Sequence, residues 1–259
     1  MSALCYLVAD VHLQPYMDEP PPLNQAFLSF LNQWATEADQ LYILGDLFEA
    51  WTGDDVCRDL YRQEIKALRQ LSAQGTQVYL AFGNRAFLMR QDFWKATGIT
   101  PIADSHVAQI QGQSYLLMHG DRLCTDDKDY QKLRKWLRNP VIQFLYLSLP
   151  KRQRAAIAHK LRRQSKDSSA QKQQQIMDVN AQAVQQCFQR HPDIKHLIHG
   201  HTHRPACHRL NIDATTHFRW VLGDWRPEAK LIKIAEGHIE LIDYKPYDGL
   251  ENLSPSPKS

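Results

Sequence analysis

Short apolar runs recur along this chain, and each is bounded by polar or glycine-rich residues. Such runs between turn-forming residues predict buried β-strands. The runs are Leu4–Ala9, Leu41–Leu44, Val78–Phe82, Tyr115–Met118 and Leu197–Ile198. Helical patterns at Asn24–Ala38 and Asp55–Ala73 lie between them. Strands that alternate with helices favour an α/β sandwich with parallel strand pairing.

The alternation changes in the second half of the chain. Three later runs, Trp220–Leu222, Leu231–Ile234 and Ile239–Tyr244, predict further strands that we expect to be antiparallel. Residues 126–184 hold only helical patterns, which predicts a helical insertion within a single domain of 259 residues. Residues 252–259 are rich in serine and proline and are expected to be disordered.

Cysteine usage and the N-terminus bear on the cellular compartment. The five cysteines are scattered without a Cys-x-x-Cys pair, so neither a disulfide framework nor a thiolate zinc site is indicated. The N-terminal segment lacks the basic region of a signal peptide, and its apolar run is too short to span a bilayer. We therefore expect a reduced, cytoplasmic setting.

A basic segment, Lys151–Lys172, stands out against a mild formal net charge of +3. Its eight lysines and arginines face one acid, Asp167, so the segment carries +7 and the rest of the chain 3 − 7 = −4. Such a run can be a solvated helix face, or it can bind nucleic acid or anionic lipid. Aromatic residues are not interleaved with it as in single-strand binding surfaces, so we expect no nucleic-acid partner.

The apolar run Val141–Leu149 immediately precedes this basic segment. A run of this length is far too short to cross a bilayer. An apolar face beside lysines and arginines suits a membrane interface or a lid that binds lipid. An ordinary buried helix with a basic neighbour is the alternative.

Potential metal ligands follow each of the first five apolar runs. They are Asp10-Val-His12, Gly45-Asp46, Gly83-Asn84, His119-Gly120 and Gly200-His201-Thr-His203. The carboxyl ends of the strands in an open α/β sheet converge on one crevice, where ligands bind. Two residues that are two positions apart leave the same face of an extended backbone, so Asp10 with His12, and His201 with His203, can each bind one ion.

This set of ligands indicates the kind of metal. It contains two carboxylates, one amide oxygen and four imidazoles: Asp10, His12, Asp46, Asn84, His119, His201 and His203. Mixed nitrogen and oxygen donors suit manganese, iron or zinc better than magnesium or calcium. Seven donors are too many for one ordinary ion, but with Asp46 as a bridge they suit two ions about 3.5–4 Å apart. The sequence therefore predicts a two-metal hydrolytic centre.

The order of these motifs resembles the calcineurin-like metallophosphoesterases. Longer blocks resemble one family among them, the UDP-2,3-diacylglucosamine pyrophosphatases of lipid A biosynthesis, from about Ala3 to Tyr244. These blocks are Leu44–Trp51 with Gly53–Asp55, Met118–Asp121 with Leu123–Asp127, Ile176–Asn180, and Ile198–Pro205. The resemblance implies a β-sandwich flanked by helices, with residues 126–184 as a helical lid.

The resemblance also implies a reaction. Hydrolysis of the pyrophosphate bond of UDP-2,3-diacylglucosamine would give lipid X and UMP at the cytoplasmic face of the bacterial inner membrane, with two Mn²⁺ ions as cofactors. The implied protein is peripheral to the membrane. Arg85 and Asn84 are the implied catalytic residues. The implied substrate contacts are Asn84, Arg85, Asp127, Ser165, Ser169, Lys172 and His201.

Three positions qualify the resemblance. Ala86 stands where the family typically has an aspartate, and loss of a carboxylate that supports a metal site typically costs ten- to a hundredfold in affinity or activity. Ser169 stands where asparagine is frequent, although its hydroxyl can still form a hydrogen bond. His199 precedes the last ligand pair, and the sequence leaves open whether it also binds metal.

Two other functions are alternatives to hydrolysis of UDP-2,3-diacylglucosamine. A dimetal phosphoesterase acting on a soluble nucleotide would leave the apolar run Val141–Leu149 without a role. A weakly active or non-catalytic protein that binds anionic lipid is favoured by Ala86, but the complete set of ligands argues against it.

Overall fold

The computed structural model describes residues 3–84, 87–171, 178–226 and 228–245, with the backbone alone for residues 162 and 164–171. The strands are β1 (Leu4–Val8), β2 (Gln40–Ile43), β3 (Gln77–Ala81), β4 (Thr100–Ile102), β5 (Ser105–Ile110), β6 (Gln113–Met118), β7 (His196–His199), β8 (Ala206–Ile212), β9 (Thr215–Val221), β10 (Ala229–Ala235) and β11 (His238–Tyr244). The helices are α1 (Pro22–Gln33), α2 (Asp54–Leu60), α3 (Arg62–Ala73), α4 (Gln91–Thr97), α5 (Lys128–Leu137), α6 (Pro140–Leu147), α7 (Lys151–Gln171) and α8 (Ala181–Arg190).

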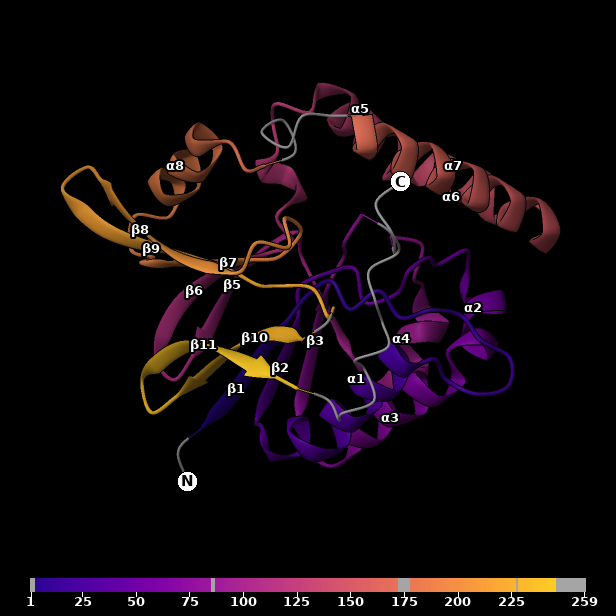
Figure 1. Cartoon of the computed structure of the whole chain (residues 1–259), viewed down its shortest axis with the longest axis horizontal. Coiled ribbons are helices and arrows are strands. Elements are labelled where there is room, and N and C mark those ends of the chain that lie inside the picture. The colour runs from indigo at the N-terminus through magenta and orange to yellow at the C-terminus, as the bar shows by residue number, and fades with distance from the viewer. Residues whose placement is uncertain (1–2, 85–86, 172–177, 227, 246–259) are drawn as a thin grey trace.

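Two β-sheets pack face to face, and helices cover both outer faces (Figure 1). The first sheet has the strand order β11-β10-β1-β2-β3-β4, and the second has the order β5-β6-β7-β9-β8. Helices α1, α3 and α4 pack on the first sheet, and α8 packs on the second. The predicted α/β sandwich with flanking helices is therefore confirmed.

Strand β1 shows why the first run of the sequence is apolar throughout. Tyr6 and Val8 face the core under α1 and α3, while Cys5 and Leu7 face the core between the two sheets. Successive side chains of a strand point to opposite faces, so a strand inside this sandwich requires apolar residues at every position. Full burial of one such leucine or valine contributes about 1.5–3 kcal/mol.

The strand pairing agrees with the sequence in part. Strands β1, β2, β3 and β4 pair in parallel, as do β6 with β7. Strands β10 and β11 are antiparallel, as expected. Strand β9 was expected to be antiparallel, which is right for its pairing with β8 but wrong for its pairing with β7.

Some elements were missed or merged in the prediction. Strands β4, β5 and β8 and helix α4 had no predicted counterpart. The helix expected over Asp55–Ala73 is two helices that meet at Tyr61, where φ is −128°. The buried ring of Tyr61 packs against Phe48 and Trp51, with ring centroids 4.5 and 5.9 Å away. The break in the predicted helix thus lies at a residue whose ring is packed in the core.

Helices α5, α6 and α7 follow one another between β6 and β7 and project beyond the sandwich (Figure 1). The described part of residues 126–184 contains helices and no strand, as the sequence predicted. Asp127 accepts a hydrogen bond from Tyr130 N at the start of α5, and Asn139 accepts one from Val141 N at the start of α6. The role of this insertion as a lid and the single-domain organisation stay predictions.

The tail that was predicted to be disordered, residues 252–259, lies outside the described residues. Among the residues that are described, no helix combines the length and the apolar character needed to cross a membrane.

Candidate metal centre

Five loops meet at one edge of the sandwich. Three follow β1, β2 and β3 of the first sheet, and two follow β6 and β7 of the second. Asp10 N donates to Gly45 O at 3.2 Å, and Gly200 N donates to His119 O at 2.9 Å. His201 N donates to Asp10 Oδ2 at 2.7 Å, which joins the second sheet to the first. The crevice that was predicted for a single open sheet therefore lies where the edges of two sheets meet.

The backbone is left-handed at five of the seven predicted ligands. The φ angle is 52° at Asp10, 55° at His12, 47° at Asp46, 70° at His201 and 53° at His203. The other described non-glycine residues with positive φ all lie in the turns between β5 and β6, β8 and β9, or β10 and β11. Such a conformation costs of order 1–3 kcal/mol per residue and clusters at functional sites. Backbone strain therefore singles out this edge of the sandwich.

Two glycines allow the loops to approach each other closely. A Cβ atom at Gly83 would collide with the Asp46 side chain, and one at Gly200 would collide with Asp10 Oδ2. Neither position tolerates a side chain without displacement of a carboxylate. The glycines of the Gly-Asn and Gly-His motifs are thus required because a Cβ atom at either position does not fit beside the carboxylates.

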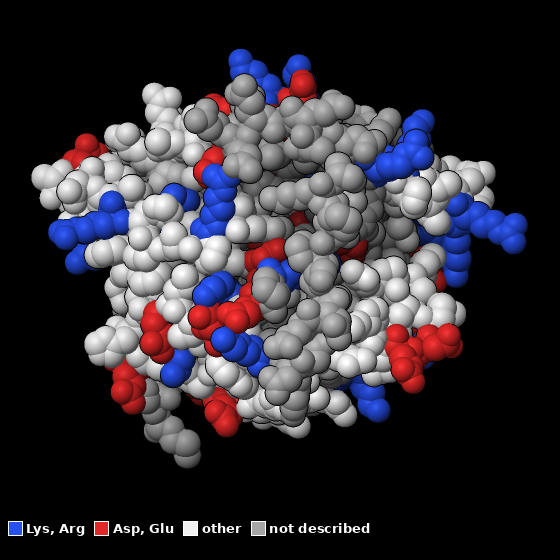
Figure 2. All heavy atoms as spheres, viewed as in Figure 1, with Lys and Arg blue, Asp and Glu red and all other residues white. Residues whose placement is uncertain are grey.

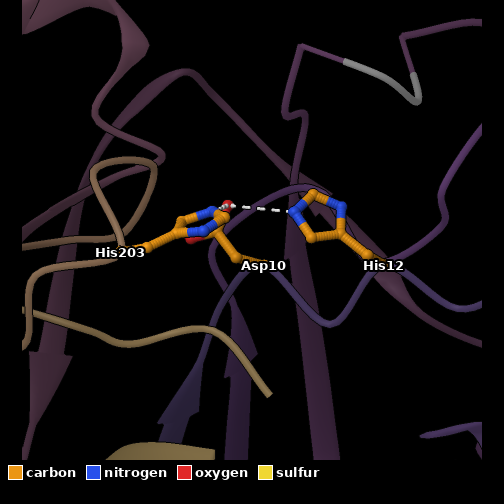
Figure 3. Close-up of side chains that lie close together, drawn as sticks. All are labelled: Asp10, His12 and His203. Carbon is orange, nitrogen blue, oxygen red and sulfur yellow. Dashed lines mark ion pairs between the residues drawn. The ribbon is translucent and has the colours of Figure 1, made fainter. Parts of the chain in front are cut away.

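The first group of potential ligands is Asp10, His12 and His203. Asp10 Oδ1 lies 3.3 Å from His203 Nε2 and 4.0 Å from His12 Nε2. Figure 3 shows the two imidazole rings on either side of the Asp10 carboxylate. One ligand atom from each residue lies within 4.8 Å of the others, close enough to share one ion.

The second group is Asp10, Asp46 and His119, which are all buried. His119 Nε2 lies 3.7 Å from Asp46 Oδ2, while His119 Nδ1 lies 2.9 Å from Leu44 O. The Asn84 amide lies against Asp46, with its nitrogen 3.0 Å from Oδ1 when it is oriented to donate. Asp10 is common to both groups, and the expected bridging role of Asp46 stays a prediction.

The buried polar atoms fit a bound cation. Among the described residues, Asp10 Oδ1 and His119 Nε2 are buried; His119 Nε2 has no hydrogen-bond partner, and Asp10 Oδ1 faces the imidazole nitrogens of His203 and His12 at 3.3 and 4.0 Å. A buried polar atom without a partner costs of order 1–3 kcal/mol, and a cation would satisfy both atoms. Carboxylate oxygens and imidazole nitrogens together suit divalent transition ions. The residues of this crevice therefore fit the metal ions that the sequence predicted.

Two carboxylates lie behind the ligand histidines. Glu49 Oε2 is 3.5 Å from His12 Nδ1, and Asp224 Oδ2 is 3.5 Å from His203 Nδ1. A carboxylate at the far ring nitrogen fixes the orientation of the imidazole, so that its other nitrogen faces the metal. In both histidines that other nitrogen, Nε2, faces Asp10.

Neither of these two carboxylates was among the residues predicted for the site. Glu49 lies inside the block Leu44–Trp51, and its type alone does not distinguish it from a surface acid. Asp224 carried a usable signal, because Leu222-Gly223-Asp224 repeats the apolar-Gly-Asp pattern of Leu44-Gly45-Asp46 after another strand.

His199, which the sequence left open as a ligand, uses both ring nitrogens within the protein. Its Nδ1 is 2.8 Å from Gly200 O, and its Nε2 is 3.0 Å from Arg219 Nη1. Complete burial lowers the pKa of His199 to about 3; the charge of Arg219 lowers it further, whereas the hydrogen bond with Gly200 O opposes the shift. His199 therefore supports the loop that carries His201 and is not itself a ligand.

Burial and nearby charge give two histidines of the centre very different pKa values. Burial alone would lower the pKa of His203, but hydrogen bonds and charge from Asp10 and Asp224 raise it to about 10. Burial, together with the imidazole of His119, lowers the pKa of His201 to about 4. At neutral pH and without metal, His203 therefore holds a proton and His201 does not. Metal binding at His203 requires that this proton leaves.

The structure places few of the predicted substrate contacts. Asp127 caps α5, with Oδ1 3.1 Å from Tyr130 N. Ser165 and Ser169 lie on α7, but their side chains are outside the described part of the chain. Arg85, Ala86 and Lys172 are outside the described residues altogether. The structure thus brings five of the seven predicted metal ligands into the two groups. Of the other two, Asn84 lies against Asp46, and the ring of His201 lies outside both groups, with its centroid 5.0 Å from that of His119. The substrate contacts stay predictions.

Comparison with known proteins adds independent information. The model of the calcineurin-like phosphoesterase family matches residues 5–205. The UDP-2,3-diacylglucosamine hydrolases of Yersinia pestis bv. Antiqua (strain Angola) and Yersinia pseudotuberculosis serotype O:3 (strain YPIII) are each 44% identical over 244 residues, which is 94% of this chain and 99% of theirs. A dimetal phosphatase from Danio rerio is 13% identical with a TM-score of 0.45, over 95% of this chain and 99% of that one, a likeness too weak to draw on.

Proposed function

The chain belongs to the calcineurin-like phosphoesterase family, and from this premise we propose that it hydrolyses the pyrophosphate bond of UDP-2,3-diacylglucosamine. The proposed products are 2,3-diacylglucosamine 1-phosphate (lipid X) and UMP, in a step of lipid A biosynthesis. The observation that carries the proposal is the convergence of the strained loops at Asp10, Asp46 and His201 on two groups of metal-binding atoms. The Yersinia relatives support the choice of substrate, because their similarity to this chain extends over nearly their whole length.

The proposed cofactors are two divalent ions, with Mn²⁺ as the first candidate. They would be held by Asp10, His12, Asp46, Asn84, His119, His201 and His203. Bound ions of this kind act as Lewis acids and lower the pKa of water, which favours hydrolysis of phosphoesters. We expect the protein to lose its hydrolytic activity when a chelator removes these ions.

The protein itself contributes orientation and charge. The carboxylates of Glu49 and Asp224 hold the rings of His12 and His203 so that Nε2 of each faces the crevice. Arg85, by resemblance, neutralises charge on the phosphoryl oxygens, for which the planar guanidinium is well suited. Binding and orientation of the diphosphate near these groups is the main task that the chain's own residues perform.

The insertion presents an apolar surface to solvent. On α6, Phe144 is 71% exposed and Leu145 is 60% exposed, so the alternative of an ordinary buried helix is wrong. Trp136 near the end of α5 is also exposed, at 54%. Contiguous exposed apolar residues on a soluble domain commonly mark a binding surface. We assign this one to the acyl chains of the substrate and to a membrane surface.

Positive charge lies close to this apolar surface. Figure 2 shows lysine and arginine side chains at the upper right, where Figure 1 places α6 and α7. Not every cation of the basic segment is free to meet lipid, because Arg154 is buried and donates to Thr52 O and Asp55 Oδ1, at 2.8 and 2.9 Å. The remaining charge supports peripheral binding at the cytoplasmic face of the inner membrane, where anionic lipids attract basic segments.

The proposal is tested by release of UMP from UDP-2,3-diacylglucosamine in detergent with added Mn²⁺. We expect release that EDTA abolishes and that Mn²⁺ restores. The deacylated head group is the matched substrate, and its hydrolysis should be much slower because the apolar surface no longer contributes to binding. Equal rates on both substrates would favour the soluble-nucleotide alternative. Metal binding without hydrolysis of either would favour the non-catalytic alternative.

A further inference from the structure

One face of helix α5 points at the metal centre. Tyr130 and two arginines, Arg134 and Arg138, are spaced four residues apart and therefore lie on this face. We propose that α5 is a positioning element that fixes the loops carrying His119 and Asn84, in addition to forming part of the insertion. This inference rests on the metal centre proposed above, and it gives a role to residues that the sequence analysis did not select.

The first contact of α5 is with the loop that follows His119. Asp121 in this loop is buried and accepts hydrogen bonds at Oδ2 from Arg134 Nε (2.6 Å) and Tyr130 OH (2.9 Å). Gln131 Nε2 donates to the backbone oxygen of the same residue at 2.8 Å. Three side chains of α5 thus hold both the carboxylate and the backbone of a residue two positions after a predicted ligand.

The second contact is with the loop that carries Asn84. Arg138 Nη2 donates to the backbone oxygens of Phe82 and Gly83, at 3.4 and 3.3 Å. Its other terminal nitrogen is paired with Asp104, which also accepts from Arg134 Nη2 at 2.7 Å. A planar guanidinium can span a carboxylate and two carbonyl groups in this way, whereas a lysine cannot.

The third contact is with the loop after β7. The ring of Tyr130 is stacked on the ring of His201, with centroids 6.0 Å apart and an interplanar angle of 30°. The hydroxyl of Tyr130 is held by Asp121, so the position of this ring depends on the same carboxylate. Helix α5 therefore touches loops from both sheets and lies across the edge where they meet.

These contacts argue against a role for the two arginines in substrate binding. The guanidinium groups of Arg134 and Arg138 are engaged with Asp104 and Asp121, and their side chains are only 12% and 18% exposed. A phosphate would have to displace carboxylates that already occupy these donors. Their charge acts within the protein, on the loops that carry the predicted ligands.

The test separates positioning from substrate binding with two measurements that do not use the lipid. The first is the affinity for Mn²⁺, measured by isothermal titration of the purified full chain. The second is hydrolysis of bis(p-nitrophenyl) phosphate, a small diester that does not need the apolar surface. The variants are Tyr130→Phe, which keeps the ring, and Arg138→Lys, which keeps the charge. Lys135→Ala, which removes an exposed cation from the same helix, is the matched control.

We expect Tyr130→Phe and Arg138→Lys to weaken Mn²⁺ binding about tenfold or more and to lower kcat for the diester, with little change in its KM. Lys135→Ala should change neither quantity. If the Mn²⁺ affinity is unchanged and only the KM for UDP-2,3-diacylglucosamine is raised, the proposal is overturned. Helix α5 would then contact the substrate instead of positioning the metal-binding loops. A fall in affinity that only tracks a lower Tm of the metal-free protein would overturn it as well.

The two proposals fail in different ways. If the wild-type chain binds Mn²⁺ but does not release UMP from UDP-2,3-diacylglucosamine, the proposed substrate is wrong, and the Mn²⁺ titration of the α5 variants still decides the role of the helix. Arg138→Lys carries the larger change, and Tyr130→Phe removes a single hydroxyl, so at least one folded variant is expected.

Discussion

Two carboxylates behind the metal ligands offer a quantitative test of how burial changes the strength of a carboxylate–histidine interaction. Glu49 faces His12 and Asp224 faces His203, each at 3.5 Å. The pairs differ in exposure: the side chains of His12 and Glu49 are 9% and 12% exposed, and those of His203 and Asp224 are 36% and 33% exposed. The changes Glu49→Gln and Asp224→Asn remove one charge each and keep the shape of the side chain.

The difference in exposure sets the expected magnitudes. Two unit charges at this separation interact by about 5 kcal/mol at an effective dielectric constant of about 20, and by about 1 kcal/mol in bulk water. Solvent and salt screen the exposed pair, so its contribution lies near the lower figure. Loss of the group that orients a metal-binding histidine typically costs ten- to a hundredfold in affinity. We therefore expect the affinity of the deprotonated site for Mn²⁺, corrected for the proton that His203 releases, to fall by about a hundredfold for Glu49→Gln and by about tenfold for Asp224→Asn.

The assay is a titration of each variant with Mn²⁺ at low and at high salt. The effect of Asp224→Asn should shrink at high salt, whereas that of Glu49→Gln should persist because its pair is buried. Glu236→Gln, a change at an exposed acid in the turn between β10 and β11 that is far along the chain from every predicted ligand, is the control. Equal losses for the two variants, or a larger loss for the exposed pair, would refute the argument that burial controls these contacts.

Three further outcomes are expected. Gly200→Ala would place a methyl group against Asp10 Oδ2, so Mn²⁺ affinity should fall by roughly tenfold or more while the circular dichroism spectrum is retained; unchanged affinity would contradict the close approach. Replacing Phe144 and Leu145 by serine should raise KM for the diacylated substrate and weaken binding to anionic vesicles, and should leave diester hydrolysis unchanged. Because the pKa of His203 is raised to about 10, its proton competes with metal below that pH, so Mn²⁺ affinity should rise by about tenfold or more per pH unit from pH 7 to 9, and titration in buffers of different ionisation enthalpy should detect at least one released proton.

Much of the centre could be predicted from the sequence because its signals are local. A strand that is buried on both faces must be apolar at every position, and β1 reveals itself in this way. The loop after such a strand then carries its ligand beside a glycine, as in Gly45-Asp46 and Gly200-His201. The order of these pairs along the chain was sufficient to indicate the family, and the predicted second metal stays a prediction.

Elements with weaker local signals were missed. Strand β8 alternates between partly buried and exposed residues at the edge of its sheet, and it includes His208, Arg209 and Asn211, so no apolar run marks it. Tyr61 interrupts a pattern that predicts one helix, and its buried ring packs against Phe48 and Trp51, which precede the helix. In both cases contacts in the folded protein outweigh the local pattern.

The sequence by itself determined the family and the candidate metal ligands, and the tertiary structure decided how the charged residues around these candidates are used. From the sequence, Arg154 was one of many cations in a basic run and Arg138 was one more on a helix. In the structure Arg154 is buried against Asp55, and Arg138 lies between Asp104 and the loop before Asn84. A charge is stabilised by the partner that folding brings within a few ångströms, and that partner can be a hundred residues away, so no local pattern reports it.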